Sequence, residues 1–172
     1  MKNYEDLQKF LDENKIKGEI IKKPNTQATL DACKELQAQG YNVEPTEFIK
    51  ALLMIGRDQL SQSKLILAMV RGIDKVNTDV IQQKLNLKKL RIPTPEQALE
   101  VCSYQRGGTP PIGIENLYAV VADTKLMQPA RTLIGGGGDP EHVLMIDSLE
   151  LQKKIRDQEV KLLITNIGQT IL

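Results

Sequence analysis

The sequence predicts an α+β fold, with a mixed, largely antiparallel curved sheet and helices packed outside it. Three observations support this class. Apolar runs typical of strands alternate with segments of helical periodicity, strands outnumber long helices, and the connections are short. A length of 172 residues fits one hydrophobic core, so the chain (1–172) is interpreted as a single domain.

Helices are expected where apolar residues recur at helical spacing and capping residues precede them. The clearest signal is Thr94-Pro95-Glu96-Gln97, which combines an N-cap threonine, a proline at the first helical position and a capping-box glutamine. That helix should run to about Cys102. Further helices are expected from Tyr4, after an N-cap at Thr29, from Val76, and after an acidic capping box at Asp147 and Glu150.

Strands are predicted for compact apolar runs bounded by turn residues. Residues 48–55 and 65–70 are the longest such runs, and the polar segment between them predicts two neighbouring buried strands. The other predicted strands are residues 19–23, 90–92, 117–122, 131–134, 143–146 and 160–164.

Composition restricts the class of partner. The formal net charge of +1 and the 3% aromatic content are not those of a protein that binds nucleic acid along a broad basic or stacking surface. An RNA contact would have to be local, and neither DNA nor a membrane is expected as a partner. The polar N-terminus and the absence of a long apolar run favour a cytoplasmic protein. Cys33 and Cys102 have no metal-ligand spacing and are interpreted as buried thiols.

Lys50 is unusual because almost all of its neighbours in the segment 48–54 are apolar. Its side chain could simply lie on the solvent face of an alternating strand. Alternatively, its ammonium group lies in a pocket, where it could bind a phosphate or polarise an ester carbonyl.

Residues 107–113 cannot form regular structure, because glycines and adjacent prolines interrupt both helix and strand. This segment could be no more than a tight connection. In a functional interpretation, the N–H groups of Gly107, Gly108 and Thr109 face developing negative charge while Pro110 and Pro111 fix the shape of the loop.

Three further features are weaker. The glycine run 135–138 lacks the Gly-Lys-Ser/Thr of a phosphate-binding loop, so it is either a hairpin tip or a place where backbone approaches a ligand. Asp123, at the end of a predicted strand, could be a turn cap or a functional carboxylate. His142 has no recognisable nucleophile partner and is interpreted as structural.

Several of these segments, in this order, resemble the YbaK/prolyl-tRNA-synthetase-associated editing domain family. The similarity is carried by Phe48-Ile49-Lys50-Ala51-Leu52-Leu53 and the strand to Gly72, by Lys88-Lys89-Leu90-Arg91 with Thr94-Pro95-Glu96, by the loop after Tyr104, and by Val121-Ala122-Asp123 with the glycine run. Two departures are Cys102-Ser103, where the family often has Thr-Gly, and Asp139-Pro140-Glu141-His142, which blurs the alignment.

The resemblance implies a barrel-like sheet and a free-standing hydrolase that deacylates mischarged tRNA, with no cofactor and no metal. It implies a critical role for Lys50 with Gly107, Gly108 and Thr109, and water attack on the aminoacyl ester. The substrate would be tRNA for proline carrying a small amino acid such as alanine, cysteine or serine, and prolyl-tRNA synthetase is a candidate partner. The residues assigned to substrate binding are Thr29, Tyr104, Pro110, Pro111, Asp123, Gly136 and Gly137. Those assigned to tRNA phosphates are Lys88, Lys89 and Arg91.

Two other functions remain open. The chain could be a non-catalytic module with the same fold that binds tRNA or a synthetase, or it could hydrolyse another small acyl ester.

Overall fold

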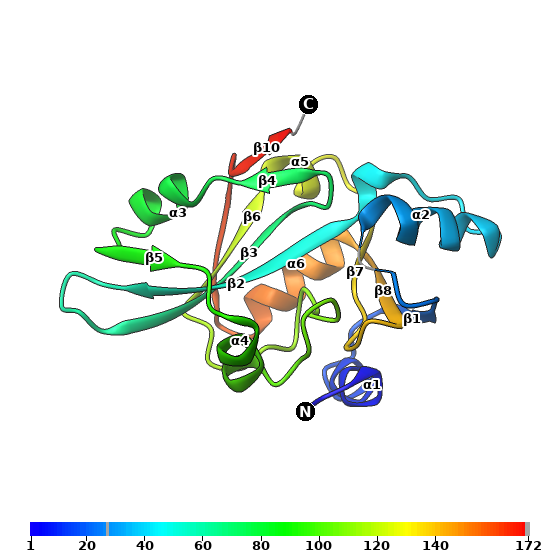
Figure 1. Ribbon diagram of the computed structural model, residues 1–172, viewed down its shortest axis with the longest axis horizontal. Helices are drawn as coiled ribbons and strands as arrows, with labels where there is room; N and C mark the ends of the chain where they lie inside the picture. Colours follow the sequence, from blue (N-terminus) through cyan, green and yellow to red (C-terminus); the bar gives the residue numbers. More distant parts are fainter. Residues whose placement is uncertain (27, 171–172) are drawn as a thin grey trace.

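A computed structural model describes residues 1–26 and 28–170 (Figure 1). The helices are α1 (Tyr4–Glu13), α2 (Thr29–Ala38), the 3-10 turn η1 (Pro45–Glu47), α3 (Thr78–Lys84), α4 (Pro95–Cys102), α5 (Thr124–Met127) and α6 (Ser148–Asp157). The strands are β1 (Gly18–Lys22), β2 (Ile49–Arg57), β3 (Ser63–Arg71), β4 (Asp74–Val76), β5 (Lys89–Arg91), β6 (Ala119–Asp123), β7 (Thr132–Gly136), β8 (His142–Asp147), β9 (Lys161–Thr165) and β10 (Gly168–Thr170). None of the helices described is long and apolar enough to span a membrane.

The strands form three sheets. A five-stranded sheet has the order β5-β2-β3-β6-β9, a three-stranded sheet the order β1-β8-β7, and β4 pairs with β10. Only the pairs β3-β6 and β6-β9 are parallel, and every other ladder is antiparallel. The predicted α+β class with a mixed, largely antiparallel sheet is therefore confirmed. A bridge between Phe48 and Ile134 joins the two larger sheets, but the ladders of the described residues do not close into a ring.

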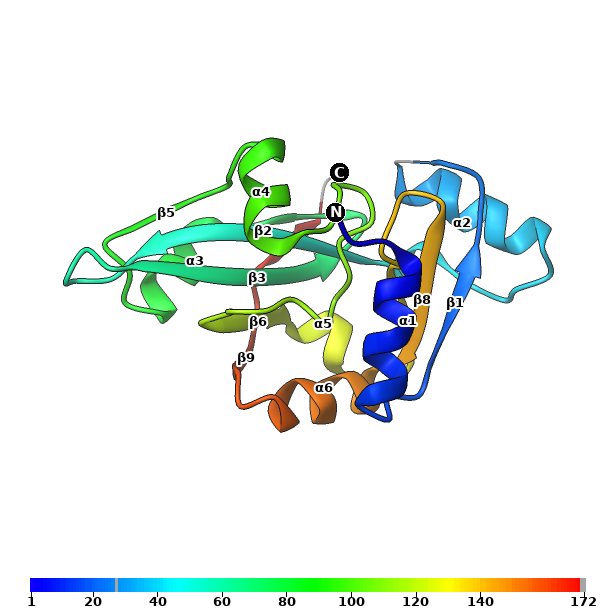
Figure 2. The same ribbon diagram turned by 90° about the horizontal axis from the view of Figure 1, so that it is seen from below.

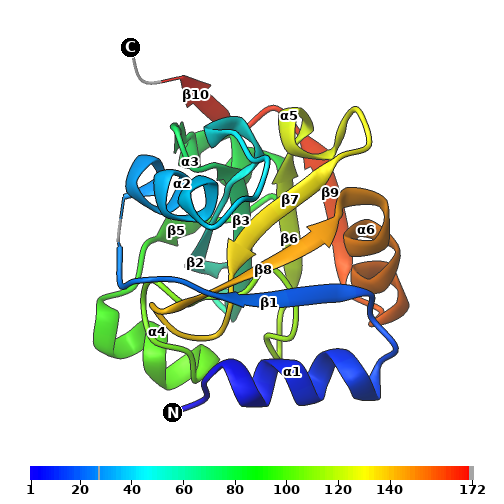
Figure 3. The same cartoon turned by 90° about the vertical axis from the view of Figure 1, so that its right-hand side faces the viewer.

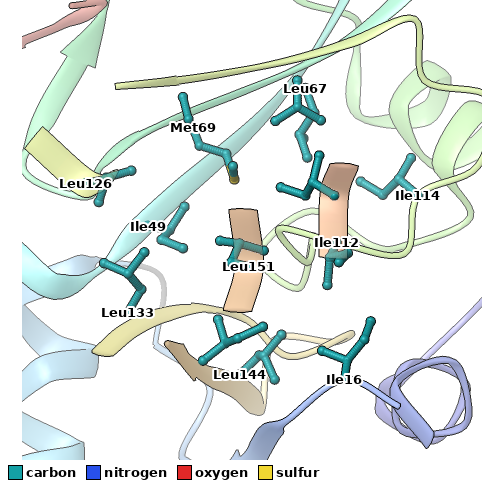
Figure 4. Close-up of a cluster of buried hydrophobic side chains, with 14 of the residues drawn as sticks. Ile16, Ile49, Leu67, Met69, Ile112, Ile114, Leu126, Leu133, Leu144 and Leu151 are labelled. Atoms are coloured by element: carbon teal, nitrogen blue, oxygen red, sulfur yellow. The ribbon is translucent and has the colours of Figure 1, made fainter. Parts of the chain in front are cut away.

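The two larger sheets pack face to face over the main core. Figure 3 shows β1, β8 and β7 crossing in front of the five-stranded sheet. Ile49, Leu67 and Met69 approach the core from one sheet and Leu133 and Leu144 from the other (Figure 4). Burial of this apolar surface supplies the main driving force for the arrangement.

Two smaller cores lie on the outer faces of the sheets. Helix α3 contributes Ile81 to a cluster with Met54 and Val70 on the far face of the five-stranded sheet. Helix α2 contributes Cys33 and Leu36 to a cluster on the far face of the three-stranded sheet. Helices α1 and α6 lie along the sides of the main core (Figure 2). Cys33 and Cys102 are both buried, free thiols.

Local signals predicted some helix starts and missed others. The helix expected from Val76 begins at Thr78, after the N-cap Asn77, because Val76 pairs with Gly168 as the last residue of β4. Thr94 accepts a hydrogen bond from the Gln97 N–H at 3.2 Å and closes the expected capping box of α4. Asp147 likewise caps α6. The expected N-cap at Thr29 was wrong: Ala28 occupies that position with no side-chain cap, and Thr29 is the first helical residue.

Candidate functional site

Lys50 lies at the second position of β2, opposite Val70 of β3. Its ammonium group is half-buried and donates a hydrogen bond to the backbone carbonyl of Asp74. Burial lowers the pKa of Lys50, and the negative charge of Asp74 partly opposes that effect. Within residues 1–26 and 28–170, no carboxylate forms an ion pair with Lys50.

A buried ion network fixes the carbonyl that holds Lys50. The carboxylate of Asp74 is fully buried and accepts hydrogen bonds from Arg71 Nε at 2.7 Å and Arg71 Nη2 at 3.1 Å. These bonds raise the pKa of Arg71. Lys125 Nζ lies 4.0 Å from Asp74 and 3.5 Å from Asp123. Arg71 and Lys125 thus hold the side chain of Asp74, and with it the backbone carbonyl that accepts the hydrogen bond from Lys50.

Asp123 is fully buried at the end of β6 and is engaged in main-chain contacts. It accepts hydrogen bonds from the N–H groups of Lys125 at 2.9 Å and Ile167 at 2.8 Å, and it caps α5. Its contacts are those of a cap that joins β6, α5 and the β9–β10 connection.

Thr29 is the first residue of α2 and lies against the turn between β3 and β4, next to the start of β2. A Cβ added at Gly72 would lie 2.2 Å from Thr29 Oγ1, so the helix packs directly on the turn that follows β3. The Gly72 N–H donates to the Phe48 carbonyl at 2.7 Å, two residues before Lys50. Only glycine at position 72 allows this approach.

The loop 107–111 lies against the end of β7. A Cβ added at Gly136 would lie 2.2 Å from the carbonyl oxygen of Thr109, and one at Gly135 would lie 3.0 Å from the ring of Pro111. Gly107 has a φ of 91°, in the left-handed region that favours glycine. The N–H of Gly108 donates to the Gln105 carbonyl at 3.0 Å, so this donor is already used.

The glycine run 135–138 is explained by close backbone packing. A Cβ at Gly137 would lie 2.5 Å from the carbonyl carbon of His142, and one at Gly138 would lie 2.7 Å from the Asn3 carbonyl oxygen. The Gly138 N–H donates to the Gly108 carbonyl at 2.9 Å. The run therefore lets the β7–β8 hairpin, the 107–111 loop and the N-terminus approach one another without side chains between them.

The strand that carries Lys50 and the strand that supports the loop, β2 and β7, lie side by side. Phe48 and Ile134 form a parallel bridge and share the apolar cluster under α2. Side chains two residues apart on a strand point to the same side, so Lys50 lies on the side of β2 that carries Met54, and its ammonium group reaches the Asp74 carbonyl. The Thr109 carbonyl covers Gly136. The bridge therefore sets the start of β2, which carries Lys50, beside the end of β7, on which Thr109 packs.

Tyr104 lies inside the main core, with only 1% of its surface exposed. Burial raises the pKa of Tyr104 to about 12. The residue thus anchors the chain in the main core three residues before the loop begins.

Lys88, Lys89 and Arg91 gather in a second region, the basic groove. They line a cavity of about 330 Å³ together with Arg57, Ile55, Gln82 and Leu90. Antiparallel pairing of β5 with β2 places Arg57 opposite Lys89. Arg57 is far from the other three cations along the chain, and the pairing of β2 with β5 makes them neighbours.

A smaller cavity of about 80 Å³ adjoins the loop, between β2 and the start of α4. It is lined by Ala51, Leu52, Leu53, Ile92, Pro93, Pro95 and Ala98, with Arg106 and Thr109 at the loop. In the described part of the chain, no group of His, Cys, Asp and Glu side chains could hold a metal ion.

The fold occurs in solved structures. The structure of the hypothetical protein APE2540 has a TM-score of 0.76 at 16% identity, covering 95% of this chain and 99% of that one. The structure of a candidate trans-editing enzyme for prolyl tRNA synthetase has a TM-score of 0.74 at 20% identity, covering 96% of each chain. These likenesses define the class: a mixed α+β domain with the fold that these two structures share.

Residues 24–154 match the aminoacyl-tRNA editing domain, and the chain belongs to that family. It is 27% identical over 107 residues to the proline–tRNA ligase of Levilactobacillus brevis, covering 62% of this chain and 18% of the ligase. It is 28% identical over 136 residues to the proline–tRNA ligase of Desulfitobacterium hafniense, covering 78% of this chain and 22% of the ligase. The chain thus spans about a fifth of the length of these relatives.

Proposed function

We propose that the chain is a hydrolase that deacylates mischarged tRNA, acting on tRNA for proline that carries alanine, cysteine or serine. Family membership and the likeness to proline–tRNA ligases support the substrate class. The observation that carries the proposal is the half-buried ammonium group of Lys50, which forms no ion pair with a carboxylate in the described part of the chain. It belongs to β2, which the Phe48–Ile134 bridge sets beside β7, and the 107–111 loop packs on the end of β7.

The proposed reaction is attack of water on the aminoacyl ester. The tetrahedral intermediate carries a negative charge on the former carbonyl oxygen, and preorganised donors stabilise it more strongly than the neutral ester. Lys50 retains two N–H bonds beyond the one given to Asp74, so it can act as an electrostatic anchor. Gly107 and Thr109 are the candidate backbone donors, since the Gly108 N–H is bound to Gln105. A ribose hydroxyl of the terminal adenosine would orient the water.

The rigidity of the loop supports selection of a small amino acid. Pro110 and Pro111 are buried, and the carbonyl oxygen of Thr109 lies close to the backbone of Gly136. The loop cannot widen without displacing β7. One methylene of difference changes binding by roughly 1–3 kcal/mol, so alanine, serine and cysteine should be separated incompletely while prolyl-tRNA is spared.

The basic groove is the proposed contact for tRNA phosphates. Lys88 and Lys89 are exposed, and Arg57 adds a further cation to the same cavity. Arg91 Nη1 donates to Gln97 Oε1 at 2.9 Å, so the guanidinium is already oriented on the groove wall. A patch of this size grips RNA weakly, so a synthetase, prolyl-tRNA synthetase in particular, is the proposed partner that delivers the substrate.

The proposal is tested by single-turnover hydrolysis of alanyl-, cysteinyl-, seryl- and prolyl-tRNA at two salt concentrations. We expect cleavage of the first three and sparing of prolyl-tRNA. Binding of charged tRNA without hydrolysis would identify a non-catalytic module instead. Equal cleavage of prolyl-tRNA would refute selection by size.

The groove is tested with the double variant Lys88→Ala/Lys89→Ala. We expect a higher KM and an unchanged kcat. A plot of the logarithm of the tRNA binding constant against the logarithm of the salt concentration should have a slope smaller in magnitude by about 1 to 2. Lys153→Ala, which removes an exposed lysine on α6, is the matched control. An unaltered KM would remove the groove from the tRNA interface.

A further inference from the structure

The first 23 residues lie outside the family match, which begins at residue 24. They nevertheless form α1 and β1, and β1 is an edge strand of the three-stranded sheet. We propose that this N-terminal unit is a positioning clamp: its two ends hold the β7–β8 turn, residues 137–141, and through it the 107–111 loop. Tyr4 and Lys23 are its positioning residues. The role in catalysis rests on the proposed function, whereas the clamp itself does not.

The first end of the clamp is the segment before α1. The Lys2 N–H donates to the Ser103 carbonyl at 2.7 Å, and Lys2 forms a bridge with Tyr104 at the entry to the loop. The Tyr4 N–H donates to Asp139 Oδ2 at 3.3 Å. This segment therefore contacts the base of the 107–111 loop and the β7–β8 turn together.

The ring of Tyr4 adds a side-chain contact to the same turn. It stacks on the imidazole of His142, with ring centroids 3.9 Å apart and planes inclined by 14°. His142 Nδ1 lies 2.7 Å from Asp139 Oδ1, within hydrogen-bond distance. Although Tyr4 is an exposed aromatic residue, its ring packs on the imidazole that lies within hydrogen-bond distance of Asp139 in the turn.

The second end of the clamp is Lys23, directly after β1. Only 5% of Lys23 is exposed, and its ammonium group donates to the Pro140 carbonyl at 2.8 Å and to the Pro24 carbonyl at 3.2 Å. Its backbone N–H donates to the Glu141 carbonyl at 2.8 Å. Burial lowers the pKa of Lys23, against the raising effect of nearby acidic groups such as Asp139 and Glu141.

Burial of a lysine among neutral carbonyls is unfavourable unless its hydrogen bonds are satisfied. Lys23 satisfies them with acceptors on Pro24 and Thr26 and with the Pro140 carbonyl, which is its shortest bond and ties it to the turn. The turn is thus held by the start of α1 on one side and by the end of β1 on the other.

Displacement of the turn must displace the loop. The Gly138 N–H donates to the Gly108 carbonyl at 2.9 Å, and a Cβ added at Gly108 would lie 2.3 Å from the Cα of Asp139. Backbones in such close contact move together because no space remains between them. A misplacement of about 1 Å at a reacting centre can cost a factor on the order of 100 in rate.

The experiment compares Tyr4→Ala and Lys23→Met with two matched controls. Tyr4→Phe keeps the stacked ring, and Lys22→Met removes the neighbouring exposed lysine of β1. The first readout is hydrogen exchange at the Gly138 amide, which reports the bond between turn and loop without reference to activity. The second is single-turnover deacylation of alanyl-tRNA, analysed for kcat and KM separately.

We expect faster exchange at Gly138 in Tyr4→Ala and Lys23→Met, with kcat lower by a factor on the order of 10 to 100 and KM unchanged. Both controls should match the wild type. Tyr4 is exposed, so its alanine variant tests the clamp even if the Lys23 variant does not fold. Wild-type exchange in Tyr4→Ala would overturn the clamp. A wild type without deacylase activity would instead refute the proposed function and leave the exchange result valid.

Discussion

Replacement of Lys50 by methionine should separate catalysis from stability. Methionine keeps an apolar stem of similar length and removes the charge. The structure gives Lys50 one hydrogen bond, to the Asp74 carbonyl, and a charged donor of this kind contributes roughly 1.5–3 kcal/mol. The burial that lowers the pKa of Lys50 also penalises its charge and offsets part of that gain. The free energy of unfolding should therefore fall by only about 1 kcal/mol.

The effect on deacylation should be much larger. Loss of one preorganised donor to an oxyanion costs roughly 100- to 1,000-fold in kcat, or about 2.7–4 kcal/mol. Urea denaturation and single-turnover hydrolysis of alanyl-tRNA measure the two effects in the same preparation. Lys64→Met is the matched control, because Lys64 is also half-buried in this sheet and lies 3.7 Å from Asp58, away from the loop. Turnover by Lys50→Met within a few fold of the wild type would refute the assignment of Lys50.

Three further predictions concern the same region. Burial lowers the pKa of Lys50, and the charged form is the active one. The contribution of Lys50 to kcat/KM is therefore complete below that pKa and is lost as pH rises through it. Lys50→Arg, where it retains activity, should keep kcat/KM high to a higher pH, measured after subtraction of uncatalysed hydrolysis. Gly136→Ala should lower the free energy of unfolding by about 1–3 kcal/mol and abolish deacylation, because its methyl group would lie 2.2 Å from the carbonyl oxygen of Thr109 in the loop. Gly40→Ala is the control: no atom lies within 4 Å of the added methyl group, so deacylation should be unchanged. Asp74→Asn should cost about 1.5–3 kcal/mol in urea denaturation, because Arg71 loses its charged partner; an unchanged midpoint would contradict the role of the buried network.

Local chemistry made several elements predictable. The capping box at Thr94 and the proline at position 95 define the start of α4 within a few residues of sequence, so no distant contact is needed. The long apolar runs likewise predicted β2 and β3 as neighbours. In contrast, β4 and β10 have three residues each and exist because Gly168–Thr170 pairs with Asp74–Val76, about 90 residues earlier. Nothing in either short segment indicates its partner.

Some features of the candidate site were likewise predictable from local sequence, and others depended on contacts between distant segments. Apolar flanks were enough to single out Lys50, and glycine and proline content was enough to single out the 107–111 loop, because both are unusual in their own local sequence. The proximity of β2, which carries Lys50, to β7, which supports the loop, depended on the Phe48–Ile134 bridge. The sequence left Asp123 open between cap and functional carboxylate, and its contacts with main-chain N–H groups are those of a cap.

Lys23 shows most clearly what only the tertiary structure decides. In the sequence it belongs to the polar stretch Lys22-Lys23-Pro24, which is typical of an exposed strand end. In the fold it is buried because the turn that contains Pro140 closes over it and supplies an acceptor from 117 residues away. The sequence by itself determined the class of fold, the helix caps and the unusual residues, since these depend on neighbours along the chain. The burial of one lysine, the pairing of short strands and the grouping of cations in the basic groove were decided by packing between distant segments, because burial and charge environment depend on neighbours in space.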